Sequence, residues 1–439
     1  MADLAESDRP TGAAAVGARG ASIGFASYLF VHAAWFLTNG LQLVLFPYLV
    51  RIILVGTAAQ LGIAQMCLNL PATFLVLLGG IVADRVDVKR QITRLYSLAM
   101  LPYLMLGILL ITHTFSYPMM IVYALGVGAI GAFTLPTRDA LLARVAPNAE
   151  GGGIQRAVSL ASLAQFSGQI VGMTLASSAQ LLGVTPLFFV QAAVMGGGAM
   201  LAQRLKPRPA PPKRSRGSGN VLAFTAGELS AGVKAVVGSP IIGPLTLISF
   251  GVATSLVGSM QVLLPLMVQS YFPADLPPDQ QPRVATALAI FTLCFWLGTI
   301  VTALCFVKIG MPKRKGRLYL FAVLLGGALL LVESLRIPYP LFCALNFLWG
   351  IANGIIITIG RGMVQELADE HLRARILSVF SFGFMVGGPV GAVSLGFLAG
   401  AIGPHAAILI PGTVAILIAI AGALATRLWR MGPDVRAVT

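Results

Sequence analysis

Apolar residues along this chain fall in blocks of about 20, separated by short polar stretches. Neither the 3.6-residue period of an amphipathic helix nor the alternation of a half-buried strand describes these blocks. Because about 20 apolar residues are needed to cross a bilayer as an α-helix, the pattern predicts an all-α membrane protein with twelve transmembrane helices. We place them at 24–50, 58–83, 92–112, 117–138, 157–182, 185–204, 241–268, 285–308, 318–335, 339–361, 375–400 and 404–428.

One long polar stretch divides the spans into two groups of six. It covers 205–240 and opens with basic residues among prolines, which is typical of a solvated linker. The two groups echo each other, because a basic loop follows both the second and the eighth span, and such repeats suit a rocking transporter. The predicted segments are a cytoplasmic tail (1–23), an N-terminal six-helix bundle (24–204), a cytoplasmic linker (205–240), a C-terminal six-helix bundle (241–428) and a cytoplasmic tail (429–439).

The charge content agrees with a membrane location. Charged residues make up only 10% of the chain, against about 25% in soluble domains. The net charge of +15 by itself suggests an acidic partner such as nucleic acid. However, 27 of the 30 Lys and Arg residues fall on one side of the predicted spans, and only Arg51, Arg283 and Arg336 fall on the other. The positive-inside rule therefore predicts a multi-pass protein of the bacterial inner membrane, with both termini cytoplasmic and no nucleic-acid partner.

The sequence offers little for catalysis. The four cysteines lie in apolar blocks without CxxC spacing, so packing explains them better than a disulfide or a metal. The histidines form no HExxH pair, and no phosphate-binding GxxxxGK[ST] loop occurs, which excludes an ATP-driven pump on this chain alone. The N-terminus lacks the apolar region of a cleavable signal peptide. We expect no catalytic residue, no metal and no cofactor, and we keep an intramembrane enzyme only as the alternative from another class.

The most specific motif lies between the second and third spans. It reads GIVADRVDVKR from Gly80 to Arg90 and resembles the cytoplasmic loop signature of the major facilitator superfamily, with Asp87 in place of the usual second glycine. A charged loop of this kind can hold one conformer and break in another. An ordinary positive-inside loop is the alternative. The resemblance implies a conformational lock made by Gly80, Asp84, Arg85, Lys89 and Arg90, with Arg138 and Arg361 at the ends of the fourth and tenth spans.

Two further segments, 134–142 and 372–378, are similar to the enterobactin-exporter and macrolide-efflux branch of that superfamily. This resemblance implies the major facilitator fold and export of a small organic molecule in exchange for protons. Two departures weaken the expectation of proton coupling. Asn39 stands where the branch often has an aspartate, and the fifth span has Ser167-Gly168-Gln169 where many antiporters have a Gly-Pro pair. An importer and a lysolipid flippase of the same fold remain alternatives, and we expect a monomer.

The candidate substrate cavity rests on neutral polar residues, since no acidic residue falls at mid-membrane in the predicted spans. Residues on the first and tenth spans follow helical spacings and so share one face of each helix. In the resembled fold these two helices line the central cavity, whereas hydrogen bonds between helices are the competing explanation. The candidates are Trp35, Asn39, Gln42, Gln165, Gln169, Asn346, Trp349 and Asn353.

The nearest candidates for a titratable group inside the membrane are His32 and Glu333. His32 is a candidate proton carrier, and the alternative is a histidine that is simply hydrogen-bonded between helices. Glu333 lies near the end of the ninth span, where we expect it at the membrane interface close to Arg336. Neutral amides and indoles suit a neutral or weakly charged aromatic or amphipathic molecule better than a metal ion.

Overall fold

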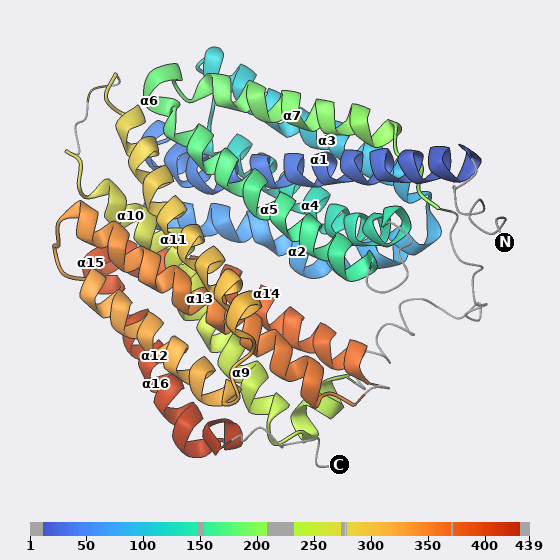
Figure 1. Ribbon diagram of the computed structural model, residues 1–439. Helices are drawn as coiled ribbons and strands as arrows, with labels where there is room; N and C mark the ends of the chain where they lie inside the picture. The colour runs from blue at the N-terminus through green and yellow to red at the C-terminus, as the bar shows by residue number, and fades with distance from the viewer. Residues whose placement is uncertain are drawn as a thin grey trace, which may run out of the picture.

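The computed structural model describes residues 12–146, 153–208, 232–273, 277, 279–369 and 372–430, without the side chains of 12–23, 76–85, 153–155, 374 and 430. Most of the predicted linker and both chain ends lie outside these residues. The described residues form helices and connections (Figure 1).

The N-terminal bundle holds six long helices. They are α1 (Gly12–Tyr48), continued by the π-helical turn η1 (Leu49–Ile53), α2 (Ala58–Arg85), α3 (Val88–Ile111), α4 (Tyr117–Val145), α5 (Gly153–Ser177) with the short α6 (Ala179–Leu182), and α7 (Thr185–Gln203).

The C-terminal bundle begins with a composite span made of α9 (Ile242–Val252), the π-helical turns η2 (Ala253–Val257) and η3 (Ser259–Leu263), and α10 (Leu264–Gln269). Its other helices are α11 (Pro282–Ile309), α12 (Lys315–Glu333), α13 (Tyr339–Leu367), α14 (Arg373–Ile402), and α15 (Pro404–Ala407) with α16 (Leu409–Ala425). A 3-10 turn, η4 (Arg427–Arg430), follows.

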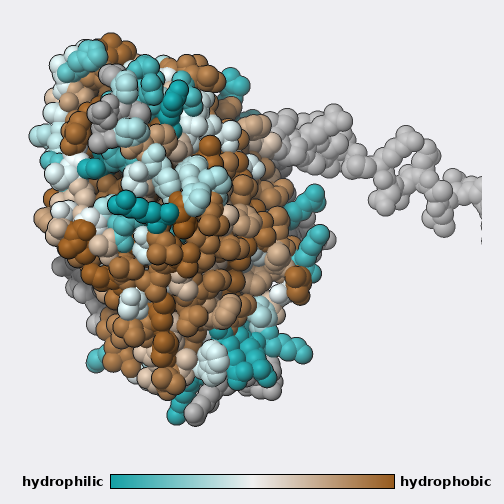
Figure 2. Space-filling view, turned by 90° about the vertical axis from the view of Figure 1, so that its left-hand side faces the viewer, coloured by the Kyte–Doolittle hydropathy of each residue, from teal (hydrophilic) through white to brown (hydrophobic). Residues whose placement is uncertain are grey.

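Eleven spans within the described residues are long and apolar enough to cross a membrane. The 28 residues of α2 match these in length, and its sequence from 58 to 83 contains no charged residue. The fold therefore has the twelve predicted transmembrane helices in two six-helix bundles. Figure 2 shows a broad continuous hydrophobic area on the visible face, with hydrophilic side chains gathered toward its upper part and its bottom edge.

The two bundles are bonded to each other at one end of the molecule. Arg51 Nε donates to Gln269 Oε1 at 3.0 Å, and Thr286 Oγ1 donates to the Ser177 carbonyl at 2.8 Å. We call this the sealed end, defined by Arg51, Ser177, Gln269 and Thr286. It lies on the left in Figure 1, near α6, α10 and α15, and the bundles diverge toward the other end.

Small residues let α2 and α14 meet across the two bundles near the sealed end. A Cβ on Gly62 would lie 2.4 Å from the Ala392 carbonyl oxygen, and one on Gly396 would lie 2.8 Å from that of Ala58. Backbones approach this closely only where side chains are absent, as in other membrane helix pairs.

The helix ends differ from the prediction in places. α4 continues past 138 to Val145, and α13 continues past 361 to Leu367. Arg138 and Arg361 therefore lie within helices instead of at their ends. α1 begins at Gly12, inside the segment predicted as a tail, and the fifth span breaks at Ser178 between α5 and α6. An apolar pattern identifies the part of a helix in the bilayer, but a helix can continue beyond it through polar residues.

Candidate functional site

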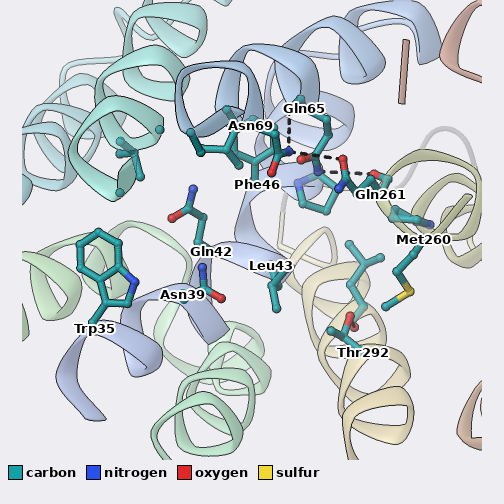
Figure 3. Close-up of a pocket in the computed structure, with 18 of the residues that line it drawn as sticks. Trp35, Asn39, Gln42, Leu43, Phe46, Gln65, Asn69, Met260, Gln261 and Thr292 are labelled. Carbon is teal, nitrogen blue, oxygen red and sulfur yellow. Dashed lines mark hydrogen bonds between the residues drawn. The ribbon is translucent and has the colours of Figure 1, made fainter. Parts of the chain in front are cut away.

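A cavity of about 230 Å³ lies between the two bundles. Its walls come from α1, α2 and α4 on one side and from η3, α10 and α11 on the other (Figure 3). It is lined by Trp35, Asn39, Gln42, Leu43, Phe46, Pro47, Gln65, Leu68, Asn69, Ala72, Val127, Gly128, Gly131, Met260, Gln261, Pro265, Leu288, Phe291 and Thr292.

Three predicted residues on α1 share the cavity wall. Trp35, Asn39 and Gln42 follow spacings of four and three residues, so the helix presents them on one face. The Gln42 side-chain oxygen accepts a hydrogen bond from the Tyr103 hydroxyl at 3.4 Å. Asn39 is half-buried, and none of the described residues forms a hydrogen bond with its side chain. Its amide is therefore available to a bound molecule.

An amide cluster joins the two bundles on the opposite side of the cavity. Gln65 Nε2 donates to the Gln261 backbone oxygen, and Asn69 Nδ2 donates to Gln261 Oε1, both at 3.4 Å. Asn69 also donates to the Gln65 carbonyl at 2.8 Å. Figure 3 shows these three amides together, facing the space beside Asn39 and Gln42. Gln261 belongs both to the cavity wall and to the contact between bundles.

The lining residues carry no formal charge and combine apolar side chains with several neutral amides. An amide both donates and accepts hydrogen bonds but neither titrates nor carries charge. The arrangement can hold an organic molecule of mixed character through stacking, apolar contact and a few hydrogen bonds. It contains no base, nucleophile pair or metal-ligand set, and no group of acidic, histidine or cysteine residues that could hold a metal occurs among the described residues.

The three predicted residues on α13 lie apart from this cavity and pack against α11. Asn346 is fully buried, and its Nδ2 donates to the Phe291 carbonyl at 2.7 Å. Asn353 Nδ2 donates to Thr299 Oγ1 at 3.4 Å. Trp349 is buried, with its ring 4.9 Å from that of Phe295. These side chains hold α11 and α13 together, which corresponds to the alternative role of hydrogen bonding between helices.

The two predicted glutamines on α5 also lie outside the cavity lining. Gln169 is buried where α5 packs on α1, and a Cβ on Gly40 would lie 2.3 Å from its carbonyl oxygen. Gln165 is half-buried on the preceding turn. The pair therefore marks a helix contact next to Asn39 instead of a wall of the cavity.

His32 is buried inside the N-terminal bundle. Its Nδ1 lies 3.2 Å from the Tyr28 hydroxyl, which donates to the Arg138 carbonyl at 3.3 Å. The Arg138 guanidinium lies over the rings of Phe36, at 4.6 Å, and Trp35, at 5.8 Å. His32 is not among the residues that line the cavity, whereas Trp35 lines it and also contacts the buried Arg138.

Part of the predicted lock falls outside the described side chains, namely Gly80, Asp84 and Arg85. The rest of the motif starts α3. Asp87 is the N-cap, accepting the Lys89 backbone N–H at 2.9 Å, and Arg90 Nε lies 3.6 Å from its carboxylate. Aspartate at an N-cap stabilises a helix start by about 1 kcal/mol, so Asp87 contributes to the start of α3. Arg361 is exposed on α13.

Sequence reasoning missed the half of the site contributed by the C-terminal bundle, namely Met260, Gln261, Pro265, Leu288, Phe291 and Thr292. Gln261 is a single amide in a long apolar span, and it lies in η3, one of two consecutive π-helical turns. Such turns occur often at functional sites, but they cannot be recognised from the residues alone. The available signal was the isolated glutamine.

Three comparisons bear on this site and its fold. Residues 24–335 and 281–438 match the sequence profile described as Major Facilitator Superfamily. The chain is 27% identical over 403 residues to the multidrug efflux pump Tap of Mycolicibacterium fortuitum, covering 89% of this chain and 92% of that one. It is 26% identical over 400 residues to the pump Tap of Mycobacterium tuberculosis, covering 89% and 90%.

Among solved structures, the nucleoside transporter NupG superposes with a TM-score of 0.71 and 15% identity. The match covers 91% of this chain and 98% of that one. At this identity the likeness establishes the fold alone.

Proposed function

The chain belongs to the Major Facilitator Superfamily and is a multi-pass membrane transporter, and from this premise we propose that it exports small amphipathic organic molecules across the bacterial inner membrane. The proposed mechanism is alternating access, in which the two bundles rock about the cavity between them. Protons are the proposed coupling ion, and the monomer is the proposed working unit.

The observation that carries this proposal is the uncharged, amide-rich cavity shared by the two bundles. A charged substrate entering it would lose hydration without gaining an opposite charge, which is costly in a low-dielectric site. A molecule with apolar faces and a few hydrogen-bonding groups would instead find partners in Asn39, Gln42 and Gln261. The two Tap pumps, which match over nearly their whole length, support multidrug efflux as the type of transport.

Orientation follows from the distribution of Lys and Arg. The positive-inside rule favours placing the sealed end outside, since the connections there hold only Arg51, Arg283 and Arg336. In this orientation the structure corresponds to the conformer that receives substrate from the cytoplasm. The amide cluster of Gln65, Asn69 and Gln261 would then separate to release substrate outside.

Dye retention in cells tests the proposal. Bacteria lacking their own efflux pumps, loaded with the neutral aromatic dye Nile red, should lose it faster when they express this chain than with an empty vector. They should gain no resistance to methyl viologen, a permanent dication. Dye loss equal to the vector control, with the protein present in the membrane, would refute export of this class.

A further inference from the structure

Glu333 is a carboxyl group buried inside the C-terminal bundle. It ends α12 and is 0% exposed, and neither of its oxygens has a hydrogen-bond partner among the described residues. Arg336, which we expected close to it, is exposed, and no ion pair between the two occurs among the described residues. A buried carboxylate without a partner is strongly disfavoured, whereas the neutral acid is tolerated.

The groups around Glu333 offer it no compensating charge. Tyr271, which follows α10, and Cys343 on α13 are the titratable groups that interact with it electrostatically. The next titratable side chains are Tyr339, whose ring lies 5.5 Å from that of Tyr271, and Cys294 on α11, which contacts Cys343. His405 on α15 lies beyond them, with its Nδ1 3.1 Å from the Ser334 carbonyl oxygen. The helix α16, which packs on α12, has no titratable residue.

Three consecutive residues connect the segment that follows Glu333 to the sealed end. Gln269 accepts the hydrogen bond from Arg51 of the other bundle. Ser270 Oγ lies 3.2 Å from His405 Nε2, and His405 Nδ1 lies 3.1 Å from the Ser334 carbonyl oxygen. The Tyr271 hydroxyl donates to the Ile337 carbonyl at 2.7 Å. Ser270 and Tyr271, directly after α10, are thus attached to the segment that follows Glu333. Gln269, the residue before them, is attached to the N-terminal bundle.

We propose that Glu333 is a proton-binding site that controls the sealed end. With the proton bound, the neutral acid fits its apolar surroundings and Tyr271 keeps its bond to Ile337. When the O–H bond breaks and the proton passes to water, the carboxylate requires a donor or hydration. The Tyr271 hydroxyl is a nearby donor. If its hydrogen bond moved from the Ile337 carbonyl to the carboxylate, Ile337 and the end of α10 would be released. The Arg51–Gln269 bond depends on that end.

The direction of the pH effect follows from linkage. The sealed conformer has no place for the carboxylate, so it binds the proton more tightly than a conformer that hydrates this site. Acidic pH therefore favours the sealed conformer, and alkaline pH favours opening of this end. One consequence rests on the proposed function. In an exporter that has released its substrate, a proton from outside would return the protein to its cytoplasm-facing state.

A distance measurement across the sealed end tests the site without any substrate. Spin labels at Thr114→Cys and Arg283→Cys, both exposed and on different bundles, are read by pulsed EPR in lipid nanodiscs. The background replaces Cys67, Cys294, Cys305 and Cys343 with Ala, which also removes Cys343 as a titrating neighbour. With Glu333 present, the fraction of molecules with a longer distance between the two labels should increase as pH rises. The Glu333→Gln variant should keep the short distance at every pH. If this variant folds poorly, Glu333→Leu replaces it, with the same expected result.

His405→Gln is the matched control, because glutamine keeps a hydrogen-bonding side chain between Ser270 and Ser334 but removes the imidazole. It should leave the pH response intact. A pH response retained in the Glu333 variants, lost in His405→Gln or absent with Glu333 present would overturn the proposal. A protein that transports nothing but still opens with rising pH would refute the proposed function and leave this site standing.

Discussion

At the scale of single residues, identical side chains have different tasks according to what their helix contacts. Asn39 and Asn353 are both asparagines beside a tryptophan four residues away in a membrane span. Asn353 donates to Thr299 on the neighbouring helix, whereas Asn39 lines the cavity without a side-chain partner among the described residues. The difference depends on helix rotation and not on residue type.

Replacing each asparagine by alanine should separate the two tasks. Asn39→Ala removes a hydrogen bond to substrate worth about 1 kcal/mol, so the dissociation constant of a transported compound should rise about fivefold. Asn353→Ala, the matched control, should leave the affinity unchanged and slightly lower the melting temperature. Binding can be followed by equilibrium dialysis of the purified protein. Equal weakening in both variants would mean that the α13 residues contact substrate after all.

A carboxylate at position 39 should change the type of compound that binds. Asn39→Asp places a titratable group in a cavity that otherwise has no charge. Affinity for a cationic aromatic dye such as ethidium should increase as pH rises and the carboxyl ionises, because an opposite charge is then available. The native protein should show little such dependence. An ethidium affinity in Asn39→Asp that is flat with pH would place this side chain away from the substrate.

These residues also show how far sequence reasoning reaches. The spacing of Trp35, Asn39 and Gln42 predicts that they share a face, and all three line the cavity. The same spacing on α13 predicts a shared face, but it does not say whether that face meets the cavity or α11. Glu333 likewise lies where a span ends in sequence, and only the structure, in which α13 and α16 pack on α12, shows that it is buried.

At the scale of helices, apolar blocks predict where the spans are, because the bilayer imposes their length. They do not predict the composite seventh span, in which two π-helical turns occur at Ala253–Val257 and Ser259–Leu263. π-Helical turns are rare, and no residue pattern in this span marks them. The apolar blocks also do not predict which glycines make a close helix contact, since α14 contains glycines that meet a neighbour and glycines that do not.

Two glycines on α14 make a direct test of the contact near the sealed end. A methyl group at Gly396 would lie 2.8 Å from the Ala58 carbonyl oxygen, whereas one at Gly400 would meet nothing within 4 Å. Overpacking of this kind costs about 1–3 kcal/mol, so Gly396→Ala should shift the bundles toward the conformer that is open at the sealed end. Gly400→Ala should not. The Thr114–Arg283 label pair reports the shift, and identical distances in the two variants would contradict the contact.

At the scale of the whole molecule, the proposed orientation rests on the charge distribution, and the proposed motion is a rocking of the two bundles. Alkaline phosphatase, which is active only outside the cytoplasm, should be inactive when fused after Thr439 or within 206–220. A fusion in the connection between α10 and α11 should be active and serves as the control. Activity at either of the first two positions would reverse the assigned orientation.

The central claim is that this chain moves small amphipathic organic molecules through the cavity between its bundles. The most direct measurement is uptake of radiolabelled neutral and weakly basic aromatic compounds into proteoliposomes with an imposed pH gradient. At least one compound should accumulate above protein-free liposomes, its direction should reverse with the gradient, and Asn39→Ala should lower its apparent affinity while Asn353→Ala does not. No uptake above protein-free liposomes for any compound, from protein that is folded and inserted, would contradict the claim.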